Sequence, residues 1–132
     1  MRLLLDTHIA LWAIAADPRL PPEAQHLIED RGNAVFVSAA SVWEITLKHA
    51  LARGLPSDMP ISGPEALAYF RTSGYDLLPV TADHAAAVAA LPPLHRDPFD
   101  RLIVAQALHE PLRLVTRDVH VKAYSNGILL VE

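Results

Sequence analysis

A chain of 132 residues is long enough to bury a hydrophobic core, and its hydrophobic content of 52% argues against intrinsic disorder. The absence of cysteine excludes disulfides, thiolate zinc sites and a cysteine nucleophile. With a net charge of −4, the chain lacks the basic surface that neutralises many phosphates, so a nucleic-acid substrate would require a few local cations or a bound metal ion.

The sequence shows no membrane or targeting signal. No apolar run reaches the roughly 18–20 residues that span a bilayer, and Asp6 interrupts the first apolar stretch too early for a signal peptide. We therefore expect a cytoplasmic protein without membrane contact. We also expect a single domain over residues 1–132, because the sequence has no internal repeat, linker or low-complexity tract.

The first half of the chain alternates between strand and helix patterns. We expect a strand at Arg2–Leu5, helices at Ile9–Ala15 and Pro21–Asp30, a strand at Asn33–Val37, and a helix from the cap residue Ser38 to Arg53. Proline is tolerated at the start of a helix, and Gly54 is a typical helix stop.

The second half continues this alternation. The expected elements are helices at Pro64–Ser73 and Thr81–Leu91 with a short strand at Asp76–Val80 between them, a helix from Asp97 to His109, a strand at Leu112–Thr116, a short helix at Val119–Tyr124 and a last strand at Ile128–Val131. The pattern predicts an α/β fold with a mostly parallel central sheet and helices on both faces. Ligands of such sheets bind beyond the carboxyl ends of the strands.

Acidic residues follow the expected strands at positions that share this edge. Asp6 comes directly after the first strand, and Asp118 lies two residues after Thr116 at the end of another. Glu44 lies on the helix after the second strand, and Asp100 lies in the first turn of a later helix. We therefore expect these four carboxylates to converge.

Four carboxylates in one cleft repel one another, and a hard divalent cation removes that conflict. Mg²⁺ or Mn²⁺ prefers oxygen ligands and keeps several waters, which can attack a phosphodiester bond. The sequence therefore predicts metal-dependent phosphodiester hydrolysis, with either one or two ions. No histidine pair has the spacing of a zincin motif.

Several of these residues also have structural explanations. Glu44 can pair with Lys48 one helical turn away, and Asp97 before Pro98 is typical of a helix N-cap. Asp100 in a first turn favours the helix dipole, and Asp118 can cap the following short helix. Asp6 is the hardest to explain without a ligand, because Asp is a poor strand former among apolar neighbours.

Hydroxyl, acidic and basic side chains accompany the carboxylates. The candidates for holding a carboxylate or a metal-bound water are Thr7, Ser41, Asp97 and Thr116. The candidates for contacting an RNA phosphate are Lys48, Arg96, Arg101 and Arg117.

Four segments resemble the motifs of PIN-domain nucleases, in the same order and at the same intervals. They are Leu4–His8, Ser38–Ile45 together with Lys48, His95–Ile103, and Leu114–Asp118. The stretch His95-Arg96-Asp97-Pro98-Phe99-Asp100-Arg101 is similar to the VapC toxins of bacterial and archaeal toxin–antitoxin modules.

This resemblance implies a PIN-like three-layer sandwich and an Mg²⁺- or Mn²⁺-dependent endoribonuclease. It also implies an RNA substrate, a cognate antitoxin that inhibits the enzyme, and a homodimer. The acidic quartet of the family maps onto Asp6, Glu44, Asp100 and Asp118, as metal-binding and catalytic residues. The Asp-x-x-Ile phrase favours Asp100 over Asp97 as the third acid.

Other readings of the first acid are less compatible with the sequence. A phosphatase of the haloacid dehalogenase type needs a second Asp two residues after the first, where this chain has His8. A phospho-receiver domain needs an adjacent acidic pair, which Leu5-Asp6-Thr7 does not offer. The remaining alternative is a PIN-like module that binds RNA or protein without cleaving it.

The antitoxin implied by the resemblance needs an apolar docking surface. Leu11 and Trp12, apolar residues of the early helices, are candidate contacts for it.

Overall fold

The computed structural model describes residues 1–56 and 58–132. Its centre is a five-stranded sheet in the order β3-β2-β1-β4-β5, in which every neighbouring pair of strands is parallel. The strands are β1 (Arg2–Leu5), β2 (Ala34–Ser38), β3 (Asp76–Leu78), β4 (Arg113–Thr116) and β5 (Leu129–Leu130). The predicted α/β fold with a parallel sheet is confirmed.

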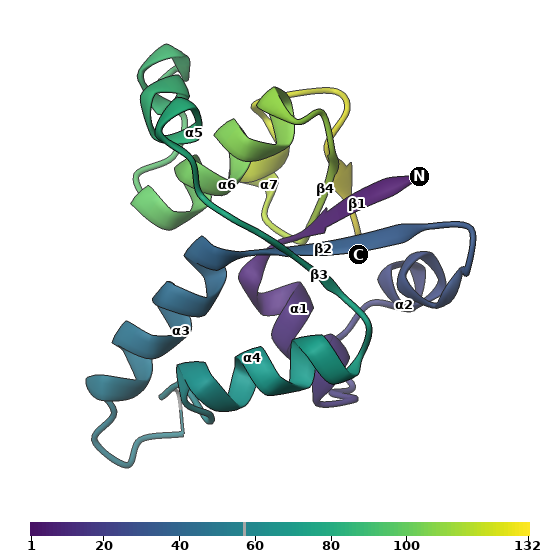
Figure 1. Ribbon diagram of the computed structural model, residues 1–132, viewed down its shortest axis with the longest axis vertical. Helices are drawn as coiled ribbons and strands as arrows, with labels where there is room; N and C mark the ends of the chain where they lie inside the picture. Colours follow the sequence, from purple (N-terminus) through teal and green to yellow (C-terminus); the bar gives the residue numbers. More distant parts are fainter. Residues whose placement is uncertain (57) are drawn as a thin grey trace.

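Helices lie on both faces of the sheet, as Figure 1 shows. They are α1 (Thr7–Ile14), α2 (Pro22–Glu29), α3 (Ala39–Ala50), α4 (Gly63–Thr72), α5 (Ala82–Ala87), the 3-10 helix η1 (Val88–Ala90), α6 (Pro98–His109) and α7 (Val119–Lys122). The first four gather on one side of the sheet, and α5, α6 and α7 gather on the other. This is the three-layer arrangement expected from the sequence.

Alternate residues of the central strand β1 supply two separate cores. Leu3 and Leu5 pack into the cluster beneath α1, α2 and α4, whereas Leu4 packs into the cluster beneath α6 and α7. All three leucines are fully buried. Burial on both faces explains why the strand reads as a continuous apolar run rather than as an alternating one.

Helix α3 ends earlier than predicted. The sequence predicted a helix to Arg53, but the helix ends at Ala50 and Leu51 is 72% exposed. The Asp58 carboxylate accepts hydrogen bonds from the main-chain N–H groups of Arg53 and Leu55, at 2.8 and 2.7 Å. These bonds offer the backbone an alternative to another helical turn.

Smaller differences concern other helix ends. Helix α1 begins at Thr7 rather than Ile9, and Asp6 occupies its N-cap position without a side-chain capping hydrogen bond. The helix predicted at Thr81–Leu91 is a short α-helix followed by η1. In the part of the chain described here, no helix has the length and apolar character needed to cross a membrane.

Candidate metal centre

The first two predicted acids lie at the ends of neighbouring strands. Asp6 follows β1, and its main-chain N–H donates to the Val115 carbonyl of β4 at 3.0 Å. The Thr116 hydroxyl donates to Asp6 Oδ2 at 2.7 Å and accepts from the main-chain N–H of Asp118 at 3.0 Å. Thr116 therefore ties the Asp6 carboxylate to the segment that carries Asp118.

Glu44 enters from helix α3 and is only 3% exposed. Its Oε1 accepts from the Thr7 hydroxyl at 2.8 Å, and its Oε2 pairs with Lys48 Nζ at 2.6 Å. The Thr7 hydroxyl also contacts Ser41 Oγ at 2.9 Å. The ion pair with Lys48 and a position in the cleft were alternatives for Glu44 in the sequence, and the structure contains both.

The carboxylates at the start of α6 have different partners. Asp97 Oδ1 accepts from the main-chain N–H groups of Phe99 and Asp100, at 2.9 and 3.0 Å, so Asp97 caps the helix. Asp100, in the first turn, directs Oδ2 toward His95 Nε2 at 2.7 Å. Asp97 thus has the capping geometry that the sequence predicted, whereas the Asp100 carboxylate contacts His95 instead of capping the helix.

Asp118 contributes to both a cap and the cleft. Its Oδ1 accepts from the main-chain N–H of His120 at 2.8 Å, which caps α7. Its Oδ2 lies 3.7 Å from His95 Nε2. One oxygen of this carboxylate therefore stabilises the helix start, while the other faces His95.

All four acids line one cleft of about 520 Å³ at the carboxyl edge of the sheet. The other lining residues are His8, Ile9, Trp12, Lys48, His95, Asp97 and Arg117. Among the predicted supporting residues, Thr7, Ser41 and Thr116 are buried. Thr7 is hydrogen-bonded to Glu44 and Thr116 to Asp6, while Ser41 contacts the Thr7 hydroxyl. The structure thus brings together side chains from four distant parts of the chain.

The cleft concentrates negative charge in a poorly solvated place. Burial raises the pKa of Asp6, against the opposing effect of the Thr116 hydrogen bond. Burial, followed by the nearby charge of Asp6, raises the pKa of Asp100 to about 7, although the His95 hydrogen bond opposes this. Carboxylate oxygens under such repulsion are a suitable donor set for a hard divalent cation, so the residues fit a metal ion.

The sequence did not single out His95 as a site residue. It lies between the carboxylates of Asp100 and Asp118, and its own main-chain N–H donates to the Tyr124 hydroxyl at 3.0 Å. Its signal in the sequence is its place as the first residue of the His95–Arg101 stretch that resembles the VapC toxins. That signal gives His95 no role of its own, because the residue that fixes its backbone is distant in the chain.

The predicted phosphate contacts occupy different environments. Lys48 and Arg117 line the cleft, whereas Arg96 is exposed outside it. Arg101 instead donates through Nη1 to the Pro92 carbonyl at 3.1 Å and to the Tyr124 hydroxyl at 3.0 Å. The Arg101 guanidinium is therefore already hydrogen-bonded within the protein, whereas Lys48 and Arg117 lie at the cleft.

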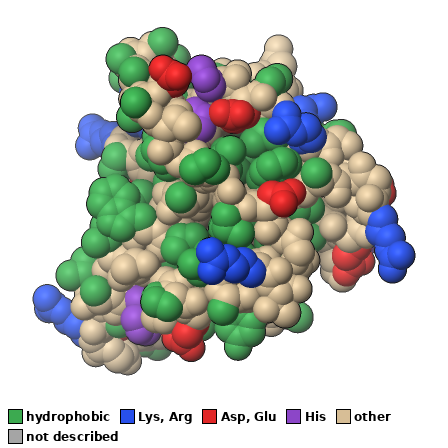
Figure 2. Space-filling model, in the orientation of Figure 1, with side chains coloured by type: hydrophobic (Ala, Val, Ile, Leu, Met, Phe, Trp, Pro, Cys, Tyr) green, Lys and Arg blue, Asp and Glu red, His purple; other side chains and the backbone are tan. Residues whose placement is uncertain are grey.

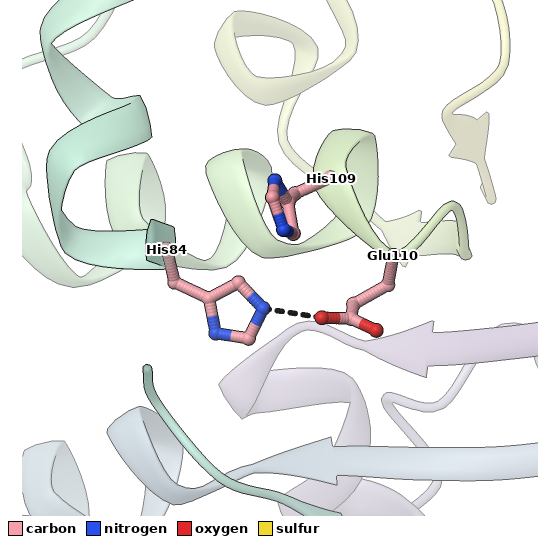
Figure 3. Close-up of side chains that lie close together, drawn as sticks. All are labelled: His84, His109 and Glu110. Carbon is pink, nitrogen blue, oxygen red and sulfur yellow. Dashed lines mark hydrogen bonds and ion pairs between the residues drawn. The ribbon is translucent and has the colours of Figure 1, made fainter. Parts of the chain in front are cut away.

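A second group of possible metal ligands, His84, His109 and Glu110, lies outside the cleft (Figure 3). His84 is buried, and its Nδ1 accepts from the main-chain N–H of Thr81 at 3.0 Å. A neutral imidazole carries one N–H, so the proton is on Nε2, which donates to Glu110 at 2.5 Å. With both of its ring nitrogens engaged in this way, His84 links α5 to the end of α6 and has no free nitrogen to offer a metal.

Two sequence comparisons with known proteins agree on the family of this chain. A family model described as "PIN domain" matches residues 3–126. Over 124 residues, the chain is 34% identical to "Ribonuclease VapC22" of Mycobacterium tuberculosis, and the match covers 92% of this chain and 91% of that protein.

Solved structures share the fold. One match is a chain in the crystal structure of VapBC2 from Rickettsia felis bound to a promoter DNA fragment. It has a TM-score of 0.69 and 19% sequence identity, and the match covers 98% of this chain and 97% of that chain. Another match is a chain of VapBC-5 from Mycobacterium tuberculosis, described as a member of the VapBC family of toxin-antitoxin systems. It has a TM-score of 0.61 and 21% sequence identity, and the match covers 99% of this chain and 98% of that chain.

Proposed function

Because this chain belongs to the PIN-domain family, we propose that it is a metal-dependent endoribonuclease, folded as a single domain, that acts as the toxin of a toxin–antitoxin pair. The observation that carries the proposal is the convergence of Asp6, Glu44, Asp100 and Asp118 on one cleft. The name of its relative from Mycobacterium tuberculosis supports ribonuclease activity.

The four acids are the proposed residues for holding Mg²⁺ or Mn²⁺. When bound, such an ion supplies an activated water and offsets the charge that develops on the phosphate. The chain itself holds the carboxylates in place: Thr116 binds Asp6, and Thr7 binds Glu44. Fixed hydrogen bonds of this kind limit the reorganisation that the site needs during the reaction.

Lys48 and Arg117 are the proposed contacts for the RNA phosphates inside the cleft, with Arg96 at its exterior. They supply positive charge locally in a chain whose net charge is −4. Phosphate contacts of this kind position the backbone without reading the sequence of bases.

The proposed protein partner is a cognate antitoxin. A second cleft, of about 700 Å³, adjoins the acidic one and shares His8, Trp12 and Lys48 with it. Leu11 and Trp12, the contacts suggested by the sequence, both line this cleft. A partner seated there would reach the acidic cleft, which fits an inhibitor of the enzyme.

A homodimer is also part of the proposal. Helix α3 exposes two large apolar side chains on its outer surface, Trp43 at 57% and Leu47 at 40%. Figure 2 shows hydrophobic side chains on this edge of the molecule. Exposed apolar residues next to one another are typical of surfaces that bind another protein.

The experiment that tests the function is RNA cleavage by the purified protein under control of the metal supply. We expect EDTA to abolish cleavage of a labelled structured RNA, and added Mg²⁺ or Mn²⁺ to restore it. Asp6→Asn should fold normally and lose cleavage, while Asp83→Asn, a substitution of an exposed acid outside the cleft, should cleave like the wild type. Cleavage that persists in EDTA would refute the mechanism. Binding of RNA by the wild type and by Asp6→Asn alike, without cleavage by either, would favour the alternative of a non-catalytic binding module.

A further inference from the structure

We infer that His95 supplies a nitrogen ligand to the divalent ion, next to Asp100 and Asp118. The inference rests on the proposed function, since it concerns the same cleft. It adds a residue outside the acidic quartet and makes the coordination of the ion a mixture of nitrogen and oxygen.

The distances around His95 support a shared ion. Its Nε2 lies 2.7 Å from Asp100 Oδ2 and 3.7 Å from Asp118 Oδ2. Two ligands of one ion, each bonded at about 2.1 Å, are at most about 4.2 Å apart. The 2.7 Å contact is a hydrogen bond, so ligation requires the imidazole tautomer with its proton on Nδ1, which leaves the lone pair of Nε2 for the ion. Both distances from Nε2 are below the limit, so His95 and the two carboxylates are close enough to bind one ion.

The backbone of His95 is fixed by groups distant in sequence. Its main-chain N–H donates to the Tyr124 hydroxyl at 3.0 Å, and Arg101 Nη1 donates to the same hydroxyl at 3.0 Å. The imidazole also stacks on His120, with ring centroids 6.0 Å apart and an interplanar angle of 8°. A ring held in this way is preorganised to present Nε2 to the carboxylates.

Glu44 provides a contrast within the same cleft. Both of its oxygens already have partners, the Thr7 hydroxyl and the Lys48 ammonium. His95, Asp100 and Asp118 are, in contrast, a group of described residues whose possible ligand atoms all lie within 4.8 Å of one another. We therefore assign direct contact to these three residues and place Glu44 behind them, where it acts through a water molecule.

A nitrogen ligand changes which ion the site prefers. Mg²⁺ selects oxygen ligands, whereas imidazole is a good ligand for transition-metal ions. His95 should therefore favour Mn²⁺ over Mg²⁺. Replacing it with Gln should lower the affinity for Mn²⁺ by about tenfold or more, and the affinity for Mg²⁺ by less.

The test is pulsed electron paramagnetic resonance of Mn²⁺ bound to the whole protein, with calorimetric titration of Mn²⁺ and Mg²⁺. We expect the modulation of a directly coordinated nitrogen in the wild type and its loss in His95→Gln. The matched control is His8→Gln, because His8 is the other histidine that lines the cleft, and this variant should keep the modulation.

Three outcomes would overturn the inference. If Mn²⁺ binds in the cleft without nitrogen modulation, or if the modulation survives in His95→Gln, then His95 is not a ligand, while the proposed function stands. If the wild type binds neither Mn²⁺ nor Mg²⁺, the proposed function fails together with the inference.

Discussion

Asp97 and Asp100 are three residues apart at one helix start, yet their carboxylates have different partners. Asp97 is hydrogen-bonded to two main-chain N–H groups of its own helix. Asp100 faces His95 and the other acids, and its pKa is raised by burial and by Asp6. Asp97 therefore stabilises the helix, and Asp100 is the acid available to an ion.

We predict that Asp100→Asn lowers the rate of RNA cleavage far more than Asp97→Asn does. Asparagine at position 97 can still accept the two capping hydrogen bonds, whereas asparagine at position 100 removes a charged ligand. The rates are to be compared at equal Mg²⁺ concentration, after circular dichroism has shown that both variants are folded. Equal losses would mean that the wrong acid was chosen.

At the scale of residues, the sequence predicted the acidic side chains of the site better than the side chains that contact them. Asp97 before Pro98 has the local signature of a cap, and the structure confirms that interpretation. The position of His95 depends on the Tyr124 hydroxyl, 29 residues away. A contact of that kind leaves no local pattern, so the sequence alone does not assign His95 a role in the site.

At the scale of elements, the packing of α3 against α4 depends on a glycine. A Cβ atom added to Gly63, at the start of α4, would lie 1.7 Å from Thr46 Oγ1 and 2.9 Å from Thr46 Cβ. Neither distance is tolerated between real atoms, so the two helices approach one another too closely there for any side chain. Helix α3 carries Glu44, and this packing therefore helps to position the site.

We predict that Gly63→Ala destabilises the protein by about 1–3 kcal/mol, because the two helices must move apart. The matched control is Gly127→Ala, whose added Cβ would have its nearest contact at 3.5 Å and should change stability little. Chemical denaturation of the two variants and the wild type measures the effect. Equal stability of all three proteins would contradict the packing described for α3 and α4.

The connection between η1 and α6 is held by Arg101. Besides its bonds to Pro92 and Tyr124, the guanidinium lies 3.5 Å from the carbonyl oxygens of Val88, Leu91 and His95. Arg117, by contrast, is exposed beside the cleft, with its guanidinium over the Trp12 ring. The two arginines should therefore respond differently to substitution.

We predict that Arg117→Gln weakens RNA binding and lowers the slope of log affinity against log salt concentration by about 1, as expected for one lost phosphate contact. Arg101→Gln should leave that slope unchanged and lower the melting temperature instead. Binding titrations at several salt concentrations and thermal denaturation distinguish the two roles. A reduced slope for Arg101→Gln would show that Arg101 contacts an RNA phosphate as well.

Element types were predictable, but some of their ends were not. Continuous apolar strands and capped helices are set by local patterns, and the structure contains every strand at its predicted place. The end of α3 depends on the Asp58 carboxylate, which binds backbone groups that precede it in the chain. Hydrogen bonds to Asp58 compete here with a further helical turn, and the conformation of the folded loop decides between them rather than the helix propensity of the sequence.

At the scale of the whole molecule, the parallel sheet brings the four acids together. Strands β1 and β4 are neighbours, so Asp6 and the segment of Asp118 meet at one edge although the two residues are 112 positions apart. The alternation of strands and helices predicted this edge. The strand order β3-β2-β1-β4-β5 was not predictable, because local patterns do not specify which strands pair.

The central claim is that acids from distant segments bind one metal centre. The most direct test is the anomalous diffraction of crystals of the protein grown or soaked with Mn²⁺. The account predicts an anomalous peak inside the cleft, in contact with carboxylate oxygens of Asp100 and Asp118 and beside Asp6. A peak elsewhere on the molecule, or no peak at a Mn²⁺ concentration that supports RNA cleavage, would contradict it.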